Sequence, residues 1–134
     1  MSEQRVFPFL MFTGNADAAL VFYASVFDQF KVLSVTRYGP GQDGREGTVM
    51  HASFSVLGHA LMCIDSSVEH AFTFTPSVSL YVRCAGEAEL DRYFDRLAAG
   101  GMVLMPLAAY PFARKYAWIQ DRFGVSWQLS LDGM

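Results

Sequence analysis

Three histidines could take part in chemistry, and they lie far apart along the chain. His51, His59 and His70 could each act as an acid, a base or a metal ligand. His51 falls in a predicted strand and His59 in a tight turn, where a structural or solvent-exposed role is the commoner one. His70 lies beside Phe72 and Phe74, so it is the histidine whose position best fits the mouth of a binding pocket.

A second group of candidate residues lies near the C-terminal end of the chain. Ser126, Gln128 and Ser130 alternate with apolar residues over 125–131, which predicts a strand with one polar and one apolar face. Such a polar face either meets water or lines a polar cavity. The segment 121–124 begins with Asp and ends with Gly, so it predicts a turn that joins this strand to an earlier one.

Composition restricts the class of protein. The chain has 134 residues, of which 52% are hydrophobic and 17% charged, so it can bury a core as a single domain and is not disordered. The net charge is −3 and no basic run stands out, which argues against nucleic acid and against a membrane surface as partners. With no visible signal peptide and only two cysteines, Cys63 and Cys84, we expect a cytoplasmic protein with reduced, buried thiols.

The hydrophobic periods predict strands and helices in a repeated order. Two helices are expected, from Asn15 as the N-cap to about Phe27 and over 87–98. The expected strands cover 6–12, 30–38, 48–57, 60–64, 78–83, 102–110, 116–120 and 125–131. The order is therefore βαβββ followed by βαβββ. The two halves align at an offset of 70 residues through the second strand of each, which suggests a duplication.

Several segments resemble PhnB-like proteins of the vicinal-oxygen-chelate superfamily, which includes glyoxalases, ring-cleaving dioxygenases and bleomycin-resistance proteins. They are the opening Pro-Phe-Leu-Met-Phe-Thr-Gly-Asn-Ala-Asp-Ala-Ala-Leu-Val-Phe-Tyr (8–23), Arg-Tyr-Gly (37–39), and the segments 70–79 and 121–128. The resemblance implies an α+β fold in which two βαβββ modules form mixed, curved sheets around a cavity, with the helices on the outer face. One domain is expected, with modules over about 5–65 and 77–131 and a linker over 66–76.

Strand alternation within that implied fold assigns side chains to the two faces of each sheet. We expect the helix side to hold Leu61, Cys63, Val78, Leu80, Val82, Trp127, Leu129 and Leu131. We expect the cavity side to hold Pro8, Leu10, Phe12, Met62, Ile64, Ser77, Ser79, Tyr81, Ser126, Gln128 and Ser130. The predicted ligand-binding residues are Phe12, Met62, His70, Phe72, Phe74, Tyr81, Trp118 and Gln128.

The resemblance also implies where a metal would bind. Metal-dependent members place four ligands on strands, and the matching positions here are Pro8, Met62, Ser77 and Gln128. Only Gln128 could ligate, through a neutral oxygen, whereas a divalent transition metal prefers imidazole, carboxylate or thiolate. We therefore predict no metal and no cofactor.

These observations support three hypotheses about function. The protein binds a small organic molecule in a metal-free cavity, or it is a metal-dependent glyoxalase- or dioxygenase-type enzyme, or it uses acid–base chemistry of His70 or Tyr81. The sequence does not decide whether a reaction is catalysed. Similar sequences carry the name demethylubiquinone methyltransferase, but no glycine-rich loop between a strand and a helix supports methyl transfer. A homodimer is expected, because open sheet edges invite pairing and superfamily members this short usually dimerise.

Overall fold

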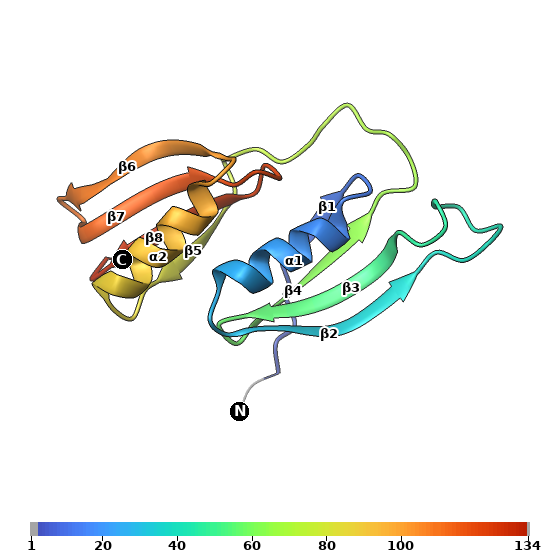
Figure 1. Cartoon of the computed structure of the whole chain (residues 1–134), viewed down its shortest axis with the longest axis horizontal. Helices are drawn as coiled ribbons and strands as arrows, with labels where there is room; N and C mark the ends of the chain where they lie inside the picture. The colour runs from blue at the N-terminus through green and yellow to red at the C-terminus, as the bar shows by residue number, and fades with distance from the viewer. Residues whose placement is uncertain (1–2, 134) are drawn as a thin grey trace. The chain divides into compact units, whose positions relative to one another are not determined.

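The computed structural model describes residues 3–133, which form two compact units, a first unit within 1–71 and a second unit within 72–134 (Figure 1). The first unit contains β1 (Phe9–Phe12), α1 (Ala16–Val26), β2 (Phe30–Arg37), β3 (Val49–Val56) and β4 (His59–Asp65). The second unit contains β5 (Ser79–Arg83), α2 (Glu87–Ala98), β6 (Met102–Tyr110), β7 (Ala113–Gln120) and β8 (Ser126–Leu131). The predicted order of two βαβββ modules is confirmed.

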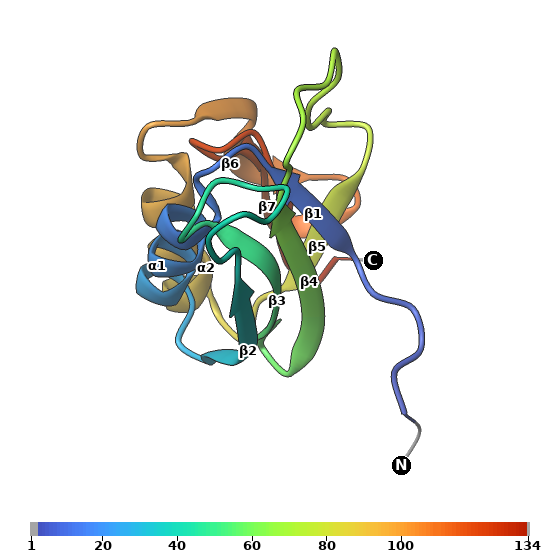
Figure 2. The same ribbon diagram turned by 90° about the vertical axis from the view of Figure 1, so that its right-hand side faces the viewer.

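Each unit has a four-stranded mixed sheet with the same topology. The orders are β1-β4-β3-β2 and β5-β8-β7-β6. In the first unit β1 runs parallel to β4, as Figure 2 shows, and the other pairs are antiparallel. In the second unit β5 runs parallel to β8 in the same way. The 70-residue offset ends after β2, because the loop 38–48 is much longer than the two-residue connection between β6 and β7.

A buried carboxylate holds the N-terminus of α1 in the first unit. Asp65, at the end of β4, is 2% exposed. One of its oxygens accepts hydrogen bonds from the backbone N–H groups of Gly14 and Ala16, at 2.9 and 3.0 Å, and the other accepts from Val49 at 2.9 Å. A carboxylate at this position satisfies helix N–H groups and interacts favourably with the helix dipole.

The predicted N-cap position of Asn15 is confirmed, but Asp65 supplies the capping hydrogen bonds. Asn15 occupies the N-cap position, but its side chain makes no capping hydrogen bond. Its side-chain oxygen instead accepts from the backbone N–H of Thr13 at 3.3 Å. Because Asp65 is charged and lies within reach, it makes the stronger bond to the first turn of the helix.

Candidate functional site

One face of the second sheet is apolar and packs against α2. The side chain of Lys115 on β7 points toward α2, since its ammonium lies 2.8 Å from Glu87 and 2.7 Å from Asp91, both on α2. Lys115 pairs with Leu131, and Trp127 and Leu129 on the same face are 1% and 0% exposed. The helix-side residues Val82, Trp127, Leu129 and Leu131 are buried, as predicted. The prediction for Val78 is wrong, because this residue precedes β5 and is 78% exposed.

The opposite face of this sheet is polar and aromatic. Directly paired residues of neighbouring strands point to the same side of the sheet, so the strand register shows which side chains lie on this face. We call this surface the polar face; its residues on β5, β7 and β8 are Ser79, Tyr81, Arg83, Tyr116, Trp118, Gln120, Ser126, Gln128 and Ser130. The face assignments predicted for Ser79, Tyr81, Ser126, Gln128 and Ser130 agree with this register. Trp118, one of the predicted ligand-binding residues, pairs directly with Gln128 and shares this face.

A chain of hydrogen bonds crosses the polar face. The indole N–H of Trp118 donates to the hydroxyl of Ser126 at 2.8 Å, and the hydroxyls of Ser126 and Ser79 lie 2.7 Å apart. Ser79 donates in turn to the carbonyl of Pro76 at 3.4 Å. The single hydroxyl hydrogen of Ser79 goes to Pro76, so Ser126 donates to Ser79 and the chain runs from Trp118 to Pro76. The three side chains therefore hold one another in fixed positions.

A tyrosine that the sequence analysis missed fixes the orientation of Gln128. The hydroxyl of Tyr116 donates to the side-chain oxygen of Gln128 at 2.5 Å. Tyr116 is 3% exposed and packs edge-on against Phe112 and Tyr110, with ring centroids 4.8 and 5.5 Å away. Burial, and then the nearby hydroxyls of Tyr81 and Tyr110, raise the pKa of Tyr116, so it remains a donor at neutral pH. Alternation of Tyr116 with Trp118 along β7 was the signal that could have revealed it.

The far end of the polar face holds an unusual hydroxyl. Ser130 is 1% exposed, and its hydroxyl has no hydrogen-bond partner among residues 3–133. The backbone of Gly133 lies directly over it, because a Cβ added there would collide with the Ser130 hydroxyl and approach that of Tyr81 at 2.8 Å. A buried polar group without a partner is rare in native proteins.

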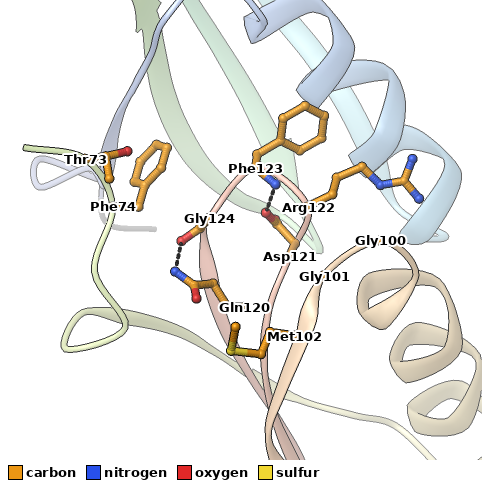
Figure 3. Close-up of a pocket in the computed structure, with 10 residues that line it drawn as sticks. All are labelled: Thr73, Phe74, Gly100, Gly101, Met102, Gln120, Asp121, Arg122, Phe123 and Gly124. Carbon is orange, nitrogen blue, oxygen red and sulfur yellow. Dashed lines mark hydrogen bonds between the residues drawn. The ribbon is translucent and has the colours of Figure 1, made fainter.

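A pocket adjoins the other end of the polar face (Figure 3). It has a volume of about 430 Å³. It is lined by Thr73, Phe74, Gly100, Gly101, Met102, Gln120, Asp121, Arg122, Phe123 and Gly124. Gln120, which pairs with Ser126, donates its side-chain N–H to the carbonyl of Gly124 at 3.1 Å, and Figure 3 shows Phe74 beside Gly124. The pocket and the polar face therefore share Gln120.

In the first unit the predicted face of β1 is wrong. Phe9 pairs with Met62 and Met11 with Ile64, so these four side chains share one face. Phe12 pairs with Asp65 on the helix side and is 2% exposed. Leu10, which alternates with Phe9 and Met11, lies on that helix side too. All four residues of β1 are apolar, so alternation could not assign their faces.

Of the three predicted loop residues, His70 and Phe72 are exposed, whereas Phe74 is half-buried and lines the pocket. His70 lies after β4, with its ring nitrogen 3.1 Å from the hydroxyl of Ser66, and Phe72 is 65% exposed. His51 contacts the ring of Phe9, with centroids 5.9 Å apart, and His59 lies 3.5 Å from the side chain of Gln4. Among the described residues no three His, Cys, Asp or Glu side chains come together as metal ligands would.

Comparison with known proteins assigns the chain to a family. The family described as 3-demethylubiquinone-9 3-methyltransferase matches residues 4–130. This chain belongs to that family. A solved PhnB protein from Bacillus cereus, itself described as a putative 3-demethylubiquinone-9 3-methyltransferase, is 52% identical to it, with a TM-score of 0.91 over 96% of this chain and 99% of that one.

Two further comparisons extend the relationship of this PhnB-like chain. Protein YjdN of Escherichia coli is 23% identical over 137 residues, which is 92% of each chain. A glyoxylase/bleomycin resistance protein/dioxygenase domain from Frankia sp. is 19% identical, with a TM-score of 0.67 over the whole of both chains, and this likeness concerns the fold alone. The predicted PhnB-like membership and the vicinal-oxygen-chelate fold are confirmed. Within residues 3–133 no helix has the length and apolar character of a membrane span.

The residues at the superfamily's metal positions do not fit a divalent ion in this PhnB-like chain. Pro8 and Met62 have no hard donor, and their contact is a backbone hydrogen bond from Met62 to the carbonyl of Pro8 at 2.9 Å. The hydroxyl of Ser77 lies 2.8 Å from that of Thr75. The side-chain oxygen of Gln128, the remaining candidate, already accepts from Tyr116. The absence of a metal stays a prediction.

The two thiols of this PhnB-like chain are expected to be unreactive in the folded protein. Burial raises the pKa of Cys63 to about 12, with a smaller contribution from Asp65, and burial and then Glu89 raise that of Cys84 to about 12. At pH 8 roughly one thiol in ten thousand is then ionised. Iodoacetamide should label neither cysteine until urea unfolds the protein. Labelling of the native protein at the rate of a free cysteine would contradict this expectation.

Proposed function

We propose that this PhnB-like protein binds a small organic molecule on the polar face of its second unit, without a metal. The observation that carries the proposal is the pair of fixed hydrogen-bonding arrangements, Trp118–Ser126–Ser79 and Tyr116–Gln128, on one face of one sheet. Binding sites usually combine apolar and aromatic walls with a few polar groups in fixed positions. The 430 Å³ pocket beside Gln120 offers room for part of such a ligand.

The alternative of a metal-dependent enzyme requires metal ligands that these residues do not provide. A glyoxalase- or dioxygenase-type site needs several charged or imidazole ligands to hold an ion that stabilises negative charge on the substrate. At the matching positions this chain offers proline, methionine, serine and an amide whose oxygen is engaged by Tyr116. Likeness of fold alone does not supply the missing ligands.

Native mass spectrometry of protein purified from its own host tests the proposal. We expect a population heavier than the chain by the mass of a small organic molecule, and elemental analysis below about 0.1 metal ion per chain. The variant Trp118→Ala, which removes the aromatic ring and its bond to Ser126, should lose that population. Gln29→Glu, at an exposed position of the first unit, serves as a control. Near-stoichiometric zinc, nickel, manganese or iron that Gln128→Ala abolishes would contradict the proposal.

We further propose that the protein is a cytoplasmic homodimer. Strand β2 is an edge of its sheet and carries exposed apolar residues, with Val32 43%, Leu33 50% and Val35 38% exposed. Exposed apolar edges invite pairing with another chain. Both cysteines are free and buried, which is typical of a reducing compartment. Light scattering that gives a monomer mass at micromolar concentration would argue against the dimer.

A further inference from the structure

Four polar side chains lie next to one another on the polar face, as two directly paired residues of β5 and β8 followed by a second such pair. Tyr81 of β5 pairs with Gln128 of β8, and Arg83 pairs with Ser130 in the next row of the same face. Arg83 is exposed, and no described carboxylate lies within ion-pairing distance of it. The four side chains therefore belong to two adjacent strands and lie on one side of the sheet.

Hydrogen-bond direction determines what these four side chains can offer a ligand. The oxygen of Gln128 is engaged by Tyr116, so its amide presents the N–H groups to the polar face. Arg83 can only donate, and the hydroxyls of Tyr81 and Ser130 can also donate to a ligand. In the Trp118–Ser126–Ser79 chain, each N–H or O–H hydrogen is used within the chain or by the carbonyl of Pro76, so none is left for a ligand. Donors are therefore concentrated at one end of the polar face.

We propose that the ligand of the second unit carries a carboxylate, held by Gln128, Tyr81 and the guanidinium of Arg83. A carboxylate is an acceptor with two oxygens, and it forms stronger hydrogen bonds with charged donors than a neutral carbonyl does. This inference rests on the proposed function, because it names the ligand class of the same face. The chain's net charge of −3 gives no general attraction for anions, so the selectivity comes from these groups.

Ser130 gives a second, independent indication of an acceptor at this position. Its hydroxyl is buried beneath Gly133 and has no partner among the described residues. An unpaired buried hydroxyl costs roughly 1 to 3 kcal/mol. A carboxylate oxygen at Ser130 would remove this cost, whereas an ammonium group, which can only donate, would leave the Tyr81 and Gln128 donors without partners.

The aromatic neighbours favour a ring as the body of the ligand. Trp118 pairs directly with Gln128 on the polar face and is half-buried, and Tyr81 is 38% exposed. Both rings flank the amide of Gln128, so a carboxylate held there places its attached group between them. Aromatic pairs in such positions add to the free energy of burial. Benzoate is therefore the simplest probe of this class.

The test is a titration of the ¹⁵N-labelled protein with benzoate, benzamide and benzylamine at pH 7, followed by the side-chain N–H signals of Gln128 and Arg83. Benzoate should shift both signals and bind about tenfold more tightly than benzamide, a difference of about 1.4 kcal/mol. Benzylamine should shift neither. Arg83→Gln should weaken benzoate about tenfold and leave benzamide within about twofold.

A charge-matched pair of variants completes the design. Gln128→Glu places a carboxylate against the probe and should abolish benzoate binding, whereas Gln29→Glu, at an exposed position of the first unit, should leave it unchanged. An unchanged far-ultraviolet circular dichroism spectrum would verify that each variant is folded. If benzamide or benzylamine binds as tightly as benzoate, the proposal of a carboxylate ligand is wrong, but the proposed small-molecule binding is still supported. If no probe shifts any signal of the polar face, the carboxylate proposal fails, and native mass spectrometry decides the proposed function.

Discussion

Replacement of Asp121 by asparagine is expected to lower the free energy of unfolding of the second unit by about 3 kcal/mol. Asp121 is 3% exposed, and one carboxylate oxygen accepts from the backbone N–H groups of Phe123 and Val125, at 2.8 and 3.1 Å. The other accepts the indole N–H of Trp127 at 2.9 Å. An asparagine has one acceptor side, so its NH₂ group must face donors that are left unpaired in the core.

Urea unfolding followed by tryptophan fluorescence measures this effect directly. Trp118 and Trp127 are the two tryptophans of the chain and both lie in the second unit, so their fluorescence reports on that unit. The matched control is Asp95→Asn, at an exposed position of α2. A shift of the Asp121→Asn midpoint no larger than that of the control would show that the carboxylate does not hold the turn before β8.

The corresponding change in the first unit, Asp65→Asn, is expected to cost about 2 to 3 kcal/mol. Its two oxygens accept from three backbone N–H groups, those of Gly14, Ala16 and Val49, and asparagine can satisfy only one side. Two of these groups belong to the approach and first turn of α1, where negative charge is also favoured by the helix dipole. The start of α1 and the first residue of β3 should therefore loosen together.

Amide hydrogen exchange is the appropriate measurement for this variant, because the first unit contains no tryptophan. Faster exchange at Ala16 and Val49, with unchanged exchange in β7 and β8, is the expected result. Asp43→Asn, in the exposed loop between β2 and β3, is the control. Equal exchange in the two variants would mean that Asp65 is not the residue that holds α1 on its sheet.

The sequence is sufficient to predict the helices and strands, and to predict which face of the second sheet most side chains occupy. Over 125–131 polar and apolar residues alternate strictly, so the period of two alone places Gln128 on the face opposite to Trp127. The same pattern is absent from Phe9–Phe12, where every residue is apolar, and the predicted face of Phe12 is therefore wrong. Alternation gives a face only where the two faces differ in polarity.

The partners of polar side chains are decided by the tertiary structure. Asp65 accepts from backbone groups 49 and 51 positions earlier in the chain, and Tyr116 meets Gln128 through the diagonal of the β7–β8 register. No local pattern encodes such contacts, because they depend on which strands pair and in what register.

The chain by itself thus determined two βαβββ modules and a polar strand over 125–131, and the resemblance added a set of metal positions without suitable ligands. The tertiary structure decided which polar side chains on the second sheet have hydrogen-bond partners within the protein and which have N–H or O–H groups without one. The physical reason is that hydrogen-bond direction is a property of pairs, such as Tyr116 with Gln128, and each pair exists only once the sheet has formed.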